Sequence, residues 1–437
     1  MTRSIVEDAL AAKRASRLLA TLDTKIKNNA LHRIAVRLEQ CSDHLLSENH
    51  ADVQNALVSV SAGQISSAAL SRLTLNVEKL RQMVAGVRAV AALEDPVGKI
   101  LLRSELDDGL ELKKITCPFG VVAAIVEARP DAVAQLSALA LKSGNALMIK
   151  TGEEISRTTA GMLSVFRSAL ESTQVPVDAL TNVEGREAVH ELLGLHEQVD
   201  LVVPRGSADL VRFVSDNTRI PVLGHSDGVC HIYVEASADQ EMAIALILDG
   251  KIQAPSTCNA VETALVDQAI ANEFLPQLAQ TRQSNGVKTR GCEATRRICG
   301  SHLELVSDSE WHTEYGDLTL AIRVVSGMDS ALEHIQRFGS HHTDCIVTRN
   351  SQLADRFLRE VDSAGVFHNV STRFSDGYRY GFGAEVGIST GKLHARGPVG
   401  LEGLVTYKYL LSGTGQCVSQ YVGAQARAFR HQTAAHD

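Results

Sequence analysis

The sequence predicts an α/β protein in which a helical segment precedes two regions of alternating strands and helices. The first ninety or so residues carry apolar side chains at the three- and four-residue spacing of amphipathic helices. From Val121 onward, short apolar runs typical of buried strands alternate with longer stretches of helical periodicity. Such alternation is typical of a mostly parallel sheet with helices on its faces.

A β-hairpin separates the helical segment from the α/β regions. Its strands are expected over 100–106 and 110–115, and Asp107-Asp108-Gly109 supplies an Asp-Gly turn. The first α/β region is expected to hold strands 121–126, 146–150, 199–203 and 231–234 and helices 131–141, 158–170, 208–214 and 239–248. The second is expected to hold strands 261–266, 318–325 and 344–348 and helices 268–280, 330–338 and 351–360.

The last part of the chain is rich in glycine and shows little periodicity. Eight glycines lie between Gly377 and Gly403, and so much irregular backbone inside a compact protein is typical of the lining of a functional site. Terminal strands are expected over 405–411 and 417–422, and the tail after Gly423 is expected to fray.

Composition and charge exclude several classes of protein. Hydrophobic residues make up 44% and charged residues 22% of the 437 residues, which excludes a disordered or fibrous chain. The net charge is −8 with no basic cluster, which argues against a nucleic-acid partner. Glu7 and Asp8 interrupt the N-terminal apolar stretch, and no run is long enough for a membrane span. The eight scattered cysteines, without a CxxC, favour free thiols in a reducing cytoplasm.

Three segments together resemble the glutamate-5-semialdehyde dehydrogenases, also called γ-glutamyl phosphate reductases, of the aldehyde dehydrogenase superfamily. They are 127–131 (EARPD) with 142–145 (KSGN), 253–260 (QAPSTCNA) and the long loop run 373–404. The similarity covers essentially the whole chain up to about Val422 and is specific, because the loop run is long and chemically unusual.

The resemblance implies an aldehyde dehydrogenase-like fold with a cofactor domain, a catalytic domain and a small β arm for oligomerisation. The strands of such an arm present open edges that a second subunit would cover. The implied parts are a cofactor domain over 1–99 and 119–253 with a return at 386–404, a catalytic domain over 254–385, arm segments 100–118 and 405–422, and a tail over 423–437.

The resemblance also implies a reaction. It is the NADPH-dependent reduction of L-glutamyl 5-phosphate to L-glutamate 5-semialdehyde and phosphate, the second step of proline biosynthesis. The expected partner is therefore a small-molecule substrate, with a functional link to glutamate 5-kinase. We expect a cytoplasmic homodimer or homotetramer without nucleic-acid or membrane partners.

Cys258 is the predicted nucleophile. It follows Pro255-Ser256-Thr257 and precedes Asn259 at an irregular turn before a strand. A thiolate at this place can attack an acyl phosphate, expel phosphate and hold the acyl group as a thioester. An isolated cysteine is more often a small buried apolar residue, so the role of Cys258 depends on the resemblance, in which the nucleophile occupies this position. The family motif commonly has Arg where this chain has Ala254, which removes a charge near the thiol.

The predicted cofactor site lacks the GxGxxG fingerprint of ordinary dinucleotide folds. Residues 203–207 (VPRGS) follow a strand and open a helix, whose free N–H groups suit a pyrophosphate. A plain N-cap by Ser207 explains the same pattern equally well. With the resemblance, the predicted cofactor contacts here are Pro204, Gly206 and Ser207.

Lys150, Glu153 and Glu385 complete the predicted cofactor site. The resemblance implies that Lys150 contacts the adenosine ribose and that Glu385 holds the nicotinamide ribose. A carboxylate at Glu153 can bond ribose hydroxyls and repels a 2′-phosphate. Many relatives have a non-acidic residue there and use NADPH, so the family favours NADPH whereas Glu153 leaves NADH open. The alternative for all three is an ordinary solvated surface charge.

The implied substrate carries a carboxylate and a phosphate, so cations in the matching segments are candidates to bind it. Arginine pairs with both anions through two N–H donors. Arg129 takes the place of an asparagine that helps to stabilise the oxyanion in ordinary aldehyde dehydrogenases, whereas Lys142 fits a helix-end charge. The predicted substrate-binding residues are Arg129, Asn259, Arg373, His394 and Arg396.

No metal is expected. His341 and His342 are adjacent before a strand, so their side chains point to opposite sides and would not easily share one ion. Residues 221–228 (PVLGHSDG) match the segment of the water-activating glutamate in ordinary aldehyde dehydrogenases but contain no glutamate. This argues against a hydrolytic enzyme that uses NAD on another aldehyde. The intact Cys258 motif argues against a non-catalytic protein of the same fold.

Overall fold

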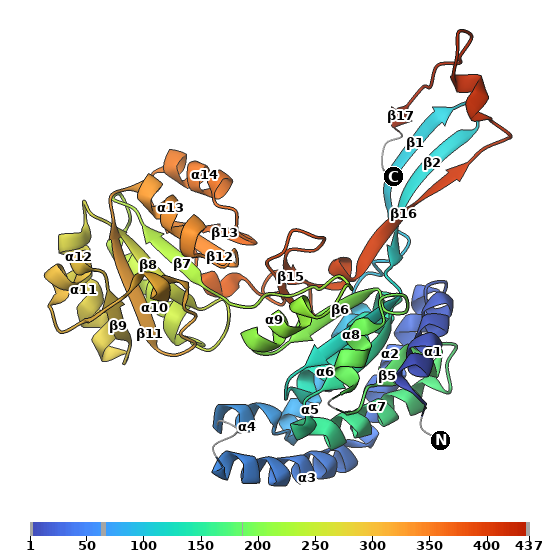
Figure 1. Ribbon diagram of the computed structural model, residues 1–437, viewed down its shortest axis with the longest axis horizontal. Helices are drawn as coiled ribbons and strands as arrows, with labels where there is room; N and C mark the ends of the chain where they lie inside the picture. Colours follow the sequence, from blue (N-terminus) through green and yellow to red (C-terminus); the bar gives the residue numbers. More distant parts are fainter. Residues whose placement is uncertain (1–2, 63–66, 186, 434–437) are drawn as a thin grey trace. The chain divides into compact units, whose positions relative to one another are not determined.

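The computed structural model describes residues 3–62, 67–185 and 187–433, and the chain forms two compact units (Figure 1). The first unit comprises Met1–Leu223, Gly383–Val386 and Val399–Asp437, and the second comprises Gly224–Phe382 and Gly387–Pro398. The second unit begins before residue 254, where the catalytic domain is expected from the sequence. It does so because β7 (Cys230–Val234) pairs with strands of the second unit.

Helices dominate the first unit. Helix α1 begins with a reciprocal capping box, in which the Glu7 N–H donates to the Ser4 hydroxyl and the Ser4 N–H donates to the Glu7 carboxylate. Its small residues pack against the adjacent sheet. The helices of this unit are α1 (Ile5–Leu19), α2 (Thr24–Gln40), α3 (Ser42–Ser61), α4 (Ser67–Leu73), α5 (Val77–Ala92), α6 (Pro130–Lys142), α7 (Ser156–Leu170), α8 (Ala188–Gly194) and α9 (Ala208–Asp216).

The first unit also holds a parallel sheet with the strand order β5-β4-β3-β6. Every residue of β3 and β4 is buried, as expected for strands covered on both faces. The strands are β3 (Val121–Val126), β4 (Ala146–Thr151), β5 (Leu180–Asn182) and β6 (Leu201–Arg205). The strands predicted at 121–126, 146–150 and 199–203 are therefore confirmed in this sheet, whereas the strand predicted at 231–234 is β7 of the second unit.

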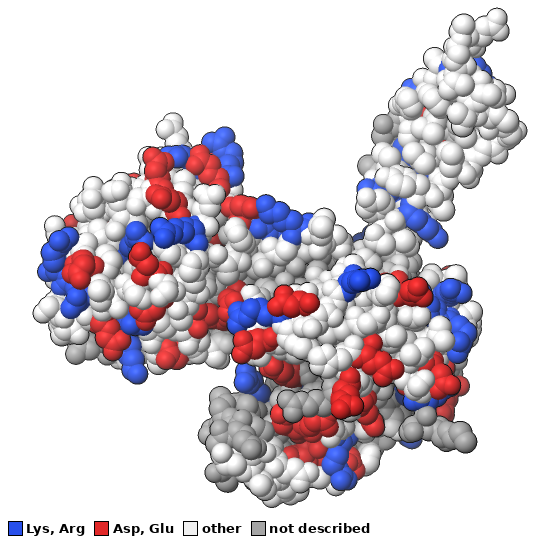
Figure 2. Space-filling view, in the orientation of Figure 1, with Lys and Arg blue, Asp and Glu red and all other residues white. Residues whose placement is uncertain are grey.

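A separate antiparallel sheet, here called the arm, contains the predicted hairpin. Its order is β16-β2-β1-β17, so the strand after residue 404 pairs with the hairpin as expected. Figure 2, in the same orientation as Figure 1, shows mostly uncharged residues on the visible face of the arm. Its strands are β1 (Ile100–Asp107), β2 (Leu110–Pro118), β16 (Val405–Ser412) and β17 (Gln432–Thr433).

Two expectations for the end of the chain are wrong. Residues 417–422 do not form a strand, because Val418–Tyr421 is a single 3₁₀ turn. The described part of the tail does not fray either, because β17 pairs with β1 and returns the chain to the hairpin. Asp107, which is nearly buried, anchors this return by accepting a hydrogen bond from the Tyr421 hydroxyl (2.8 Å) and pairing with Arg427 (2.6 Å).

The second unit is built on a parallel sheet of seven described strands in the order β10-β9-β11-β8-β7-β12-β13. The strands besides β7 are β8 (Val261–Asp267), β9 (Lys288–Gly291), β10 (Glu304–Leu305), β11 (Thr319–Val325), β12 (Thr343–Val347) and β13 (Gly365–His368). The helices are α10 (Gln240–Ile252), α11 (Ala271–Ser284), α12 (Glu293–Cys299), α13 (Met328–Phe338) and α14 (Ser351–Glu360).

The core of the second unit lies on both faces of this sheet. Along β7, Ile232 and Val234 pack in one apolar cluster with residues of α10 and α11. Tyr233 between them packs in a second cluster with residues of α13 and α14. Successive side chains of a strand point to opposite faces, so one strand contributes to both clusters. Burial of both faces is the reason that these strands read as continuous apolar runs.

The glycine-rich segment is mostly irregular, with two short strands, β14 (Gly387–Ser389) and β15 (Gly397–Val399), that pair with each other. No helix among the described residues is long and apolar enough to cross a membrane. The remaining short 3₁₀ turns are η1 (Glu153–Ile155), η2 (Val177–Ala179), η3 (Asp308–His312), η4 (Thr372–Phe374) and η5 (Leu401–Leu404).

Candidate active site

Cys258 lies at one edge of the second unit's sheet together with two histidines. It precedes β8, whereas His225 precedes β7 and His342 immediately precedes β12. These three strands are neighbours in the order β8-β7-β12 and run parallel. Because parallel strands begin at the same edge of a sheet, the loops before them converge, although the residues are far apart in the sequence.

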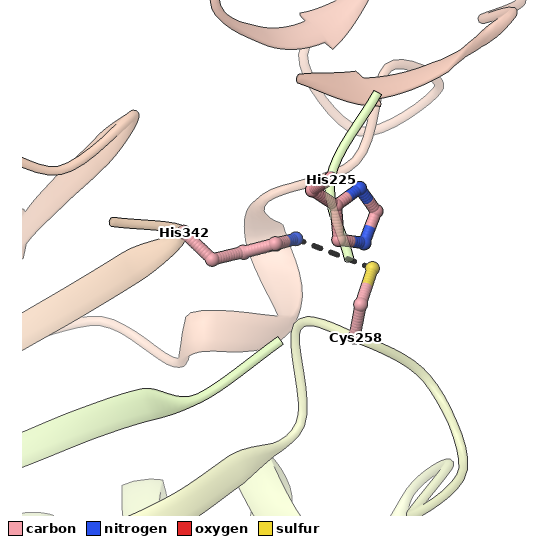
Figure 3. A group of neighbouring side chains, drawn as sticks. All are labelled: His225, Cys258 and His342. Carbon is pink, nitrogen blue, oxygen red and sulfur yellow. Dashed lines mark hydrogen bonds between the residues drawn. The ribbon is translucent and has the colours of Figure 1, made fainter. Parts of the chain in front are cut away.

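The three side chains face one another (Figure 3). The Nε2 atom of His342 lies 3.2 Å from the Sγ atom of Cys258, within hydrogen-bond distance for sulfur. The ring centroids of His225 and His342 are 5.1 Å apart. One ligand atom from each of the three residues lies within 4.8 Å of the other two. His342 is fully buried, whereas Cys258 and His225 are half-buried and accessible.

The contacts of the two rings constrain where their protons lie. The Nδ1 atom of His225 lies 2.8 Å from the carbonyl oxygen of Ile388. A carbonyl only accepts, so Nδ1 carries the proton and Nε2 of the neutral ring has a lone pair. The Nδ1 atom of His342 lies 2.9 Å from the Thr343 hydroxyl. Burial, with a smaller effect from His225, lowers the pKa of His342 to about 3, so this ring is neutral at physiological pH.

Hydrogen bonds hold the Cys258 loop in place. The Ala260 N–H donates to the Thr257 carbonyl (2.8 Å), and the Thr257 hydroxyl donates to the Ala254 carbonyl (2.7 Å). The Asn259 amide donates to the Ser375 carbonyl (2.8 Å) from a buried position. Asn259 therefore fixes the loop, and its predicted role in substrate binding stays a prediction.

Gly228 permits a very close approach to the loop that carries Cys258. A Cβ atom at this position would lie 2.1 Å from the Cys258 carbonyl oxygen and 2.5 Å from its Cα. Both neighbours are backbone atoms that cannot move aside cheaply. The Gly228 N–H donates to Glu314 (2.8 Å), and burial raises the pKa of that carboxyl. Gly228 thus packs the segment that carries His225 against Cys258.

Arg373 is the predicted substrate cation that contacts the loop carrying Cys258 directly. Its Nε donates to Gln253 (2.7 Å) and its Nη1 to the hydroxyl of Thr257 (2.7 Å), the residue before Cys258. The side chain is nearly buried, and burial lowers the pKa of the guanidinium. A buried positive charge this close to the thiol favours anions in the site.

The other predicted substrate residues have different surroundings. Arg396 pairs with Asp362 through Nη1 (2.7 Å), and its Nη2 donates to the Asp362 carbonyl (2.9 Å). His394 and Arg129 are exposed, the latter directly before α6 in the first unit. The Lys142 ammonium is buried against Asn28 (2.6 Å) and the carbonyl of Ala91 (3.0 Å). Lys142 is therefore a structural cation.

A pocket of about 350 Å³ in the first unit contains two of the predicted cofactor residues, Lys150 and Glu153. The Lys150 ammonium donates to Glu153 (3.1 Å) and to the Thr151 carbonyl (2.5 Å). Arg157 also lines the pocket and pairs with Glu48 (2.9 Å). Both cations of this lining are thus already paired with carboxylates.

The N-terminus of α9 is the predicted pyrophosphate position. The Ser207 side chain accepts from the Leu210 N–H as an N-cap, while the Ser207 N–H (2.8 Å) and hydroxyl (2.7 Å) donate to Glu127. A carboxylate therefore occupies the anion-binding end of this helix. A Cβ at Gly206 would lie 2.4 Å from the Glu127 carboxyl carbon, so this glycine allows the approach. Glu385 lies half-buried in the same unit.

Comparison with known proteins shows the family. Residues 2–296 match the aldehyde dehydrogenase family. The gamma-glutamyl phosphate reductase of Synechococcus sp. (strain JA-2-3B'a(2-13)) is 48% identical over 431 residues, covering 98% of this chain and 94% of that protein. That of Natronomonas pharaonis is 46% identical over 432 residues, covering 99% of this chain and 98% of that protein.

Solved structures agree. The crystal structure of gamma-glutamyl phosphate reductase from Thermotoga maritima superposes with a TM-score of 0.92 at 38% identity, covering 95% of this chain and all of that one. The fold is that of an aldehyde dehydrogenase-like α/β protein, and its candidate site holds a cysteine in contact with a histidine. The chain belongs to the aldehyde dehydrogenase family, and within it to the group whose curated members are named gamma-glutamyl phosphate reductases.

Two residues of the site were missed by sequence reasoning. In the sequence, His225 belongs to a segment that lacks a glutamate, and His342 is one of two adjacent histidines. The structure shows that His341 donates to the Asp362 carbonyl (2.7 Å), whereas His342 contacts Cys258. The signal available for His225 is that its segment, 221–228, matches the one that carries the water-activating glutamate in the aldehyde dehydrogenases that the sequence resembles.

Proposed function

We propose that this protein reduces L-glutamyl 5-phosphate to L-glutamate 5-semialdehyde and phosphate, with NADPH as the reductant, in proline biosynthesis. The observation that carries the proposal is the contact between Cys258 and His342 beside the buried guanidinium of Arg373. The names of the relatives supply the substrate class, since the chain matches them along nearly its whole length.

Cys258 acts as the nucleophile in this proposal. Its thiolate attacks the acyl carbon of the substrate, a carbon–sulfur bond forms, and phosphate leaves with the electrons of the carbon–oxygen bond. Neutral His342 can form a hydrogen bond with Cys258 both as a thiol and as a thiolate. Its Nε2 accepts from the thiol in one tautomer and donates to the thiolate in the other, with Thr343 as the partner of Nδ1.

Arg373 supplies the positive charge for the anionic substrate. Its bonds to Gln253 and Thr257 fix the guanidinium next to the nucleophile, and a preorganised charge costs no rearrangement when negative charge develops. We assign Arg129, His394 and Arg396 to the substrate by region only. Asn259 contributes by holding the loop, through its bond to Ser375.

The pocket at Lys150 fits the adenosine end of a nicotinamide dinucleotide. Lys150 and Glu153 present an ammonium and a carboxylate to the pocket, and both are partners for ribose hydroxyls. Pro204, Gly206, Ser207 and Glu385 belong to the same unit and complete the proposed set. When bound, the cofactor supplies the hydride that reduces the thioester. We propose NADPH because Lys150 can pair with a 2′-phosphate.

The decisive assay runs the reaction backwards. Glutamate semialdehyde is supplied with phosphate, and reduction of NADP and of NAD is followed in parallel. The proposal expects reduction that depends on phosphate and is absent in Cys258→Ser. Oxidation at the same rate without phosphate would assign a hydrolytic aldehyde dehydrogenase instead. If the protein binds dinucleotide but shows no reaction with either cofactor, the proposed substrate is wrong.

A further inference from the structure

Cys258, His225 and His342 have the donor atoms and the spacing of a metal site. Zinc binds sulfur at about 2.3 Å and imidazole nitrogen at about 2.0–2.1 Å, so the ligand atoms of a tetrahedral site lie about 3.3–3.6 Å apart. The Cys258–His342 separation is 3.2 Å, and all three ligand atoms lie within 4.8 Å of one another. Small side-chain rotations are enough to close the remaining distance to His225.

The two imidazoles are already oriented as ligands. The proton of His225 is held on Nδ1 by the Ile388 carbonyl, which leaves the lone pair of Nε2. His342 places Nδ1 at the Thr343 hydroxyl, so the tautomer that donates to Thr343 has a bare Nε2 toward Cys258. Hydrogen bonding of the second ring nitrogen is the usual way in which proteins fix the orientation and tautomer of a metal-binding histidine.

The donor set selects the class of metal. One thiolate with two imidazoles suits zinc and similar borderline-soft ions, and it does not suit magnesium or calcium, which prefer oxygen. Cys258 and His225 are accessible rather than sealed in the core, so an ion can reach them. His341, although adjacent to His342, is directed to Asp362 and takes no part.

We propose that Cys258, His225 and His342 form a reversible Zn²⁺ site that silences the nucleophile. The ion takes the three side chains as ligands and water as the fourth, and the thiol proton passes to solvent. The sulfur lone pairs are then engaged by zinc and cannot attack an acyl group. Binding of zinc is independent of the substrate, whereas the loss of turnover rests on the proposed function.

Metal binding is tested on the full chain with Co²⁺ as a spectroscopic substitute for Zn²⁺. A thiolate-to-cobalt charge-transfer band is expected in the parent and is expected to disappear on addition of Zn²⁺. The band should be absent in Cys258→Ser. Zinc affinity, measured by competition with a chromophoric chelator, should fall at least about 100-fold in Cys258→Ser, His225→Gln and His342→Gln, since losing a direct ligand costs more than losing its hydrogen-bond partner.

Two matched variants serve as controls. Cys417→Ser removes an exposed thiol, and His341→Asn removes the histidine next to His342; both should bind Zn²⁺ like the parent. Because His342 is buried, far-UV circular dichroism must show that His342→Gln is folded. If that variant is unfolded, the zinc affinities of the accessible Cys258→Ser and His225→Gln variants decide the test. Parent-like zinc affinity in Cys258→Ser, or a cobalt band that survives there, overturns the proposal.

The inhibition is measured separately by the phosphate-dependent assay. Zinc at a concentration that fills the site should abolish turnover, and a chelator should restore it. Full activity of the zinc-loaded parent would show that bound zinc does not block Cys258. An inactive protein that still shows the cobalt band, and loses it in Cys258→Ser, would instead refute the proposed reaction and leave the metal site intact.

Discussion

At the scale of single residues, the site depends on how neutral imidazoles and one buried guanidinium surround a thiol. His342 is kept uncharged by burial, and Arg373 is held against Thr257 rather than left to solvent. The sulfur therefore has a hydrogen-bond partner on one side and a fixed positive charge nearby. Such preorganisation stabilises developing negative charge without a later cost of reorganisation.

The first prediction concerns Cys258 itself. Cys258→Ala or Cys258→Ser should lower kcat by about 10⁴-fold or more, because removal of a nucleophile removes the covalent route. Dinucleotide binding, followed by fluorescence titration, and the thermal midpoint should stay close to the parent values, since the side chain is only half-buried. Activity within tenfold of the parent would show that another group forms the covalent intermediate.

The second prediction concerns Glu153 and the choice of cofactor. Glu153→Ser removes a carboxylate that would repel a 2′-phosphate and frees Lys150 from its ion pair. The preference for NADPH over NADH, as the ratio of kcat/KM values, should rise by about 1–3 kcal/mol, or about 5- to 150-fold. Glu154→Gln, a neighbouring carboxylate, serves as the control.

Two outcomes, one for the variant and one for the parent protein, would contradict this prediction. An unchanged ratio in Glu153→Ser would show that Glu153 faces solvent when the cofactor is bound. A parent that strongly prefers NADH would contradict the NADPH assignment, although the reaction class would stand.

At the scale of secondary structure, α10 is joined to β8 by a fully buried ion pair. The Lys251 ammonium lies 2.8 Å from the Glu262 carboxylate and donates to the Asp317 carbonyl (3.1 Å). Both side chains have no exposed surface, and burial raises the pKa of Glu262 to about 7 despite the adjacent ammonium. These two elements flank the loop 253–260 that carries Cys258, so the pair is part of the support of this loop.

The third prediction removes one partner of this pair. Lys251→Met should destabilise the protein by about 3–5 kcal/mol, because Glu262 is left as an uncompensated buried carboxyl. The double variant Lys251→Met, Glu262→Leu should recover most of that loss. Urea denaturation midpoints measure both effects. A single variant as stable as the parent would show that the pair contributes no net stability.

The same variant predicts a pH dependence. Without Lys251 the pKa of Glu262 in the folded state lies still further above its unfolded value, so the folded protein binds a proton that the unfolded chain releases above about pH 4. Below about pH 7 the folded parent also holds this proton, so both proteins lose stability alike as the pH rises from about 4 to 7. Relative to the parent, the stability of Lys251→Met should therefore fall only above about pH 7, by up to about 1.4 kcal/mol per unit. A loss that does not depend on pH would point to packing rather than charge.

At the scale of the whole molecule, the arm is a four-stranded sheet that carries apolar side chains on its surface. Large apolar side chains of β16 and of the turn after it are substantially exposed: Tyr407, Tyr409, Leu411, Val418 and Val422. In the described sheet, β16 forms one edge, with unpaired backbone groups along it. Exposed apolar side chains next to an open strand edge favour association with another chain.

The fourth prediction tests that association. Deleting Leu102–Lys113, or placing prolines at Glu105 and Leu112, should give smaller species by light scattering. Leu112 lies opposite both Ser104 and Leu411 in the ladders, and a proline there removes a ladder hydrogen bond. Alanines at the same two positions should leave the mass unchanged. A parent-sized assembly in the proline variant would place the subunit contacts elsewhere.

The sequence by itself determined the elements of both α/β regions. The strand at 121–126 and the helix at 351–360 were predicted to the residue, because buried parallel strands require continuous apolar runs and an amphipathic helix requires its periodic face. Short strands such as β5, β13 and β17 are not predicted from the sequence, because two to four residues are too few to show a periodic pattern. A strand is predicted over 417–422 because the two valines and the tyrosine there are common in strands, but the structure has a 3₁₀ turn at Val418–Tyr421.

The tertiary structure alone decided the surroundings of Cys258. Cys258 could be named from its own loop, but His225 and His342 reach it only because β8, β7 and β12 are neighbours in one parallel sheet. Local sequence sets the length and burial of a strand, whereas strand order depends on how long connections pack back across the sheet. For the same reason, the sequence places Lys142 only as a charge at a helix end, and the packing of α6 against the N-terminal helices shows it to be buried against Asn28 and Ala91.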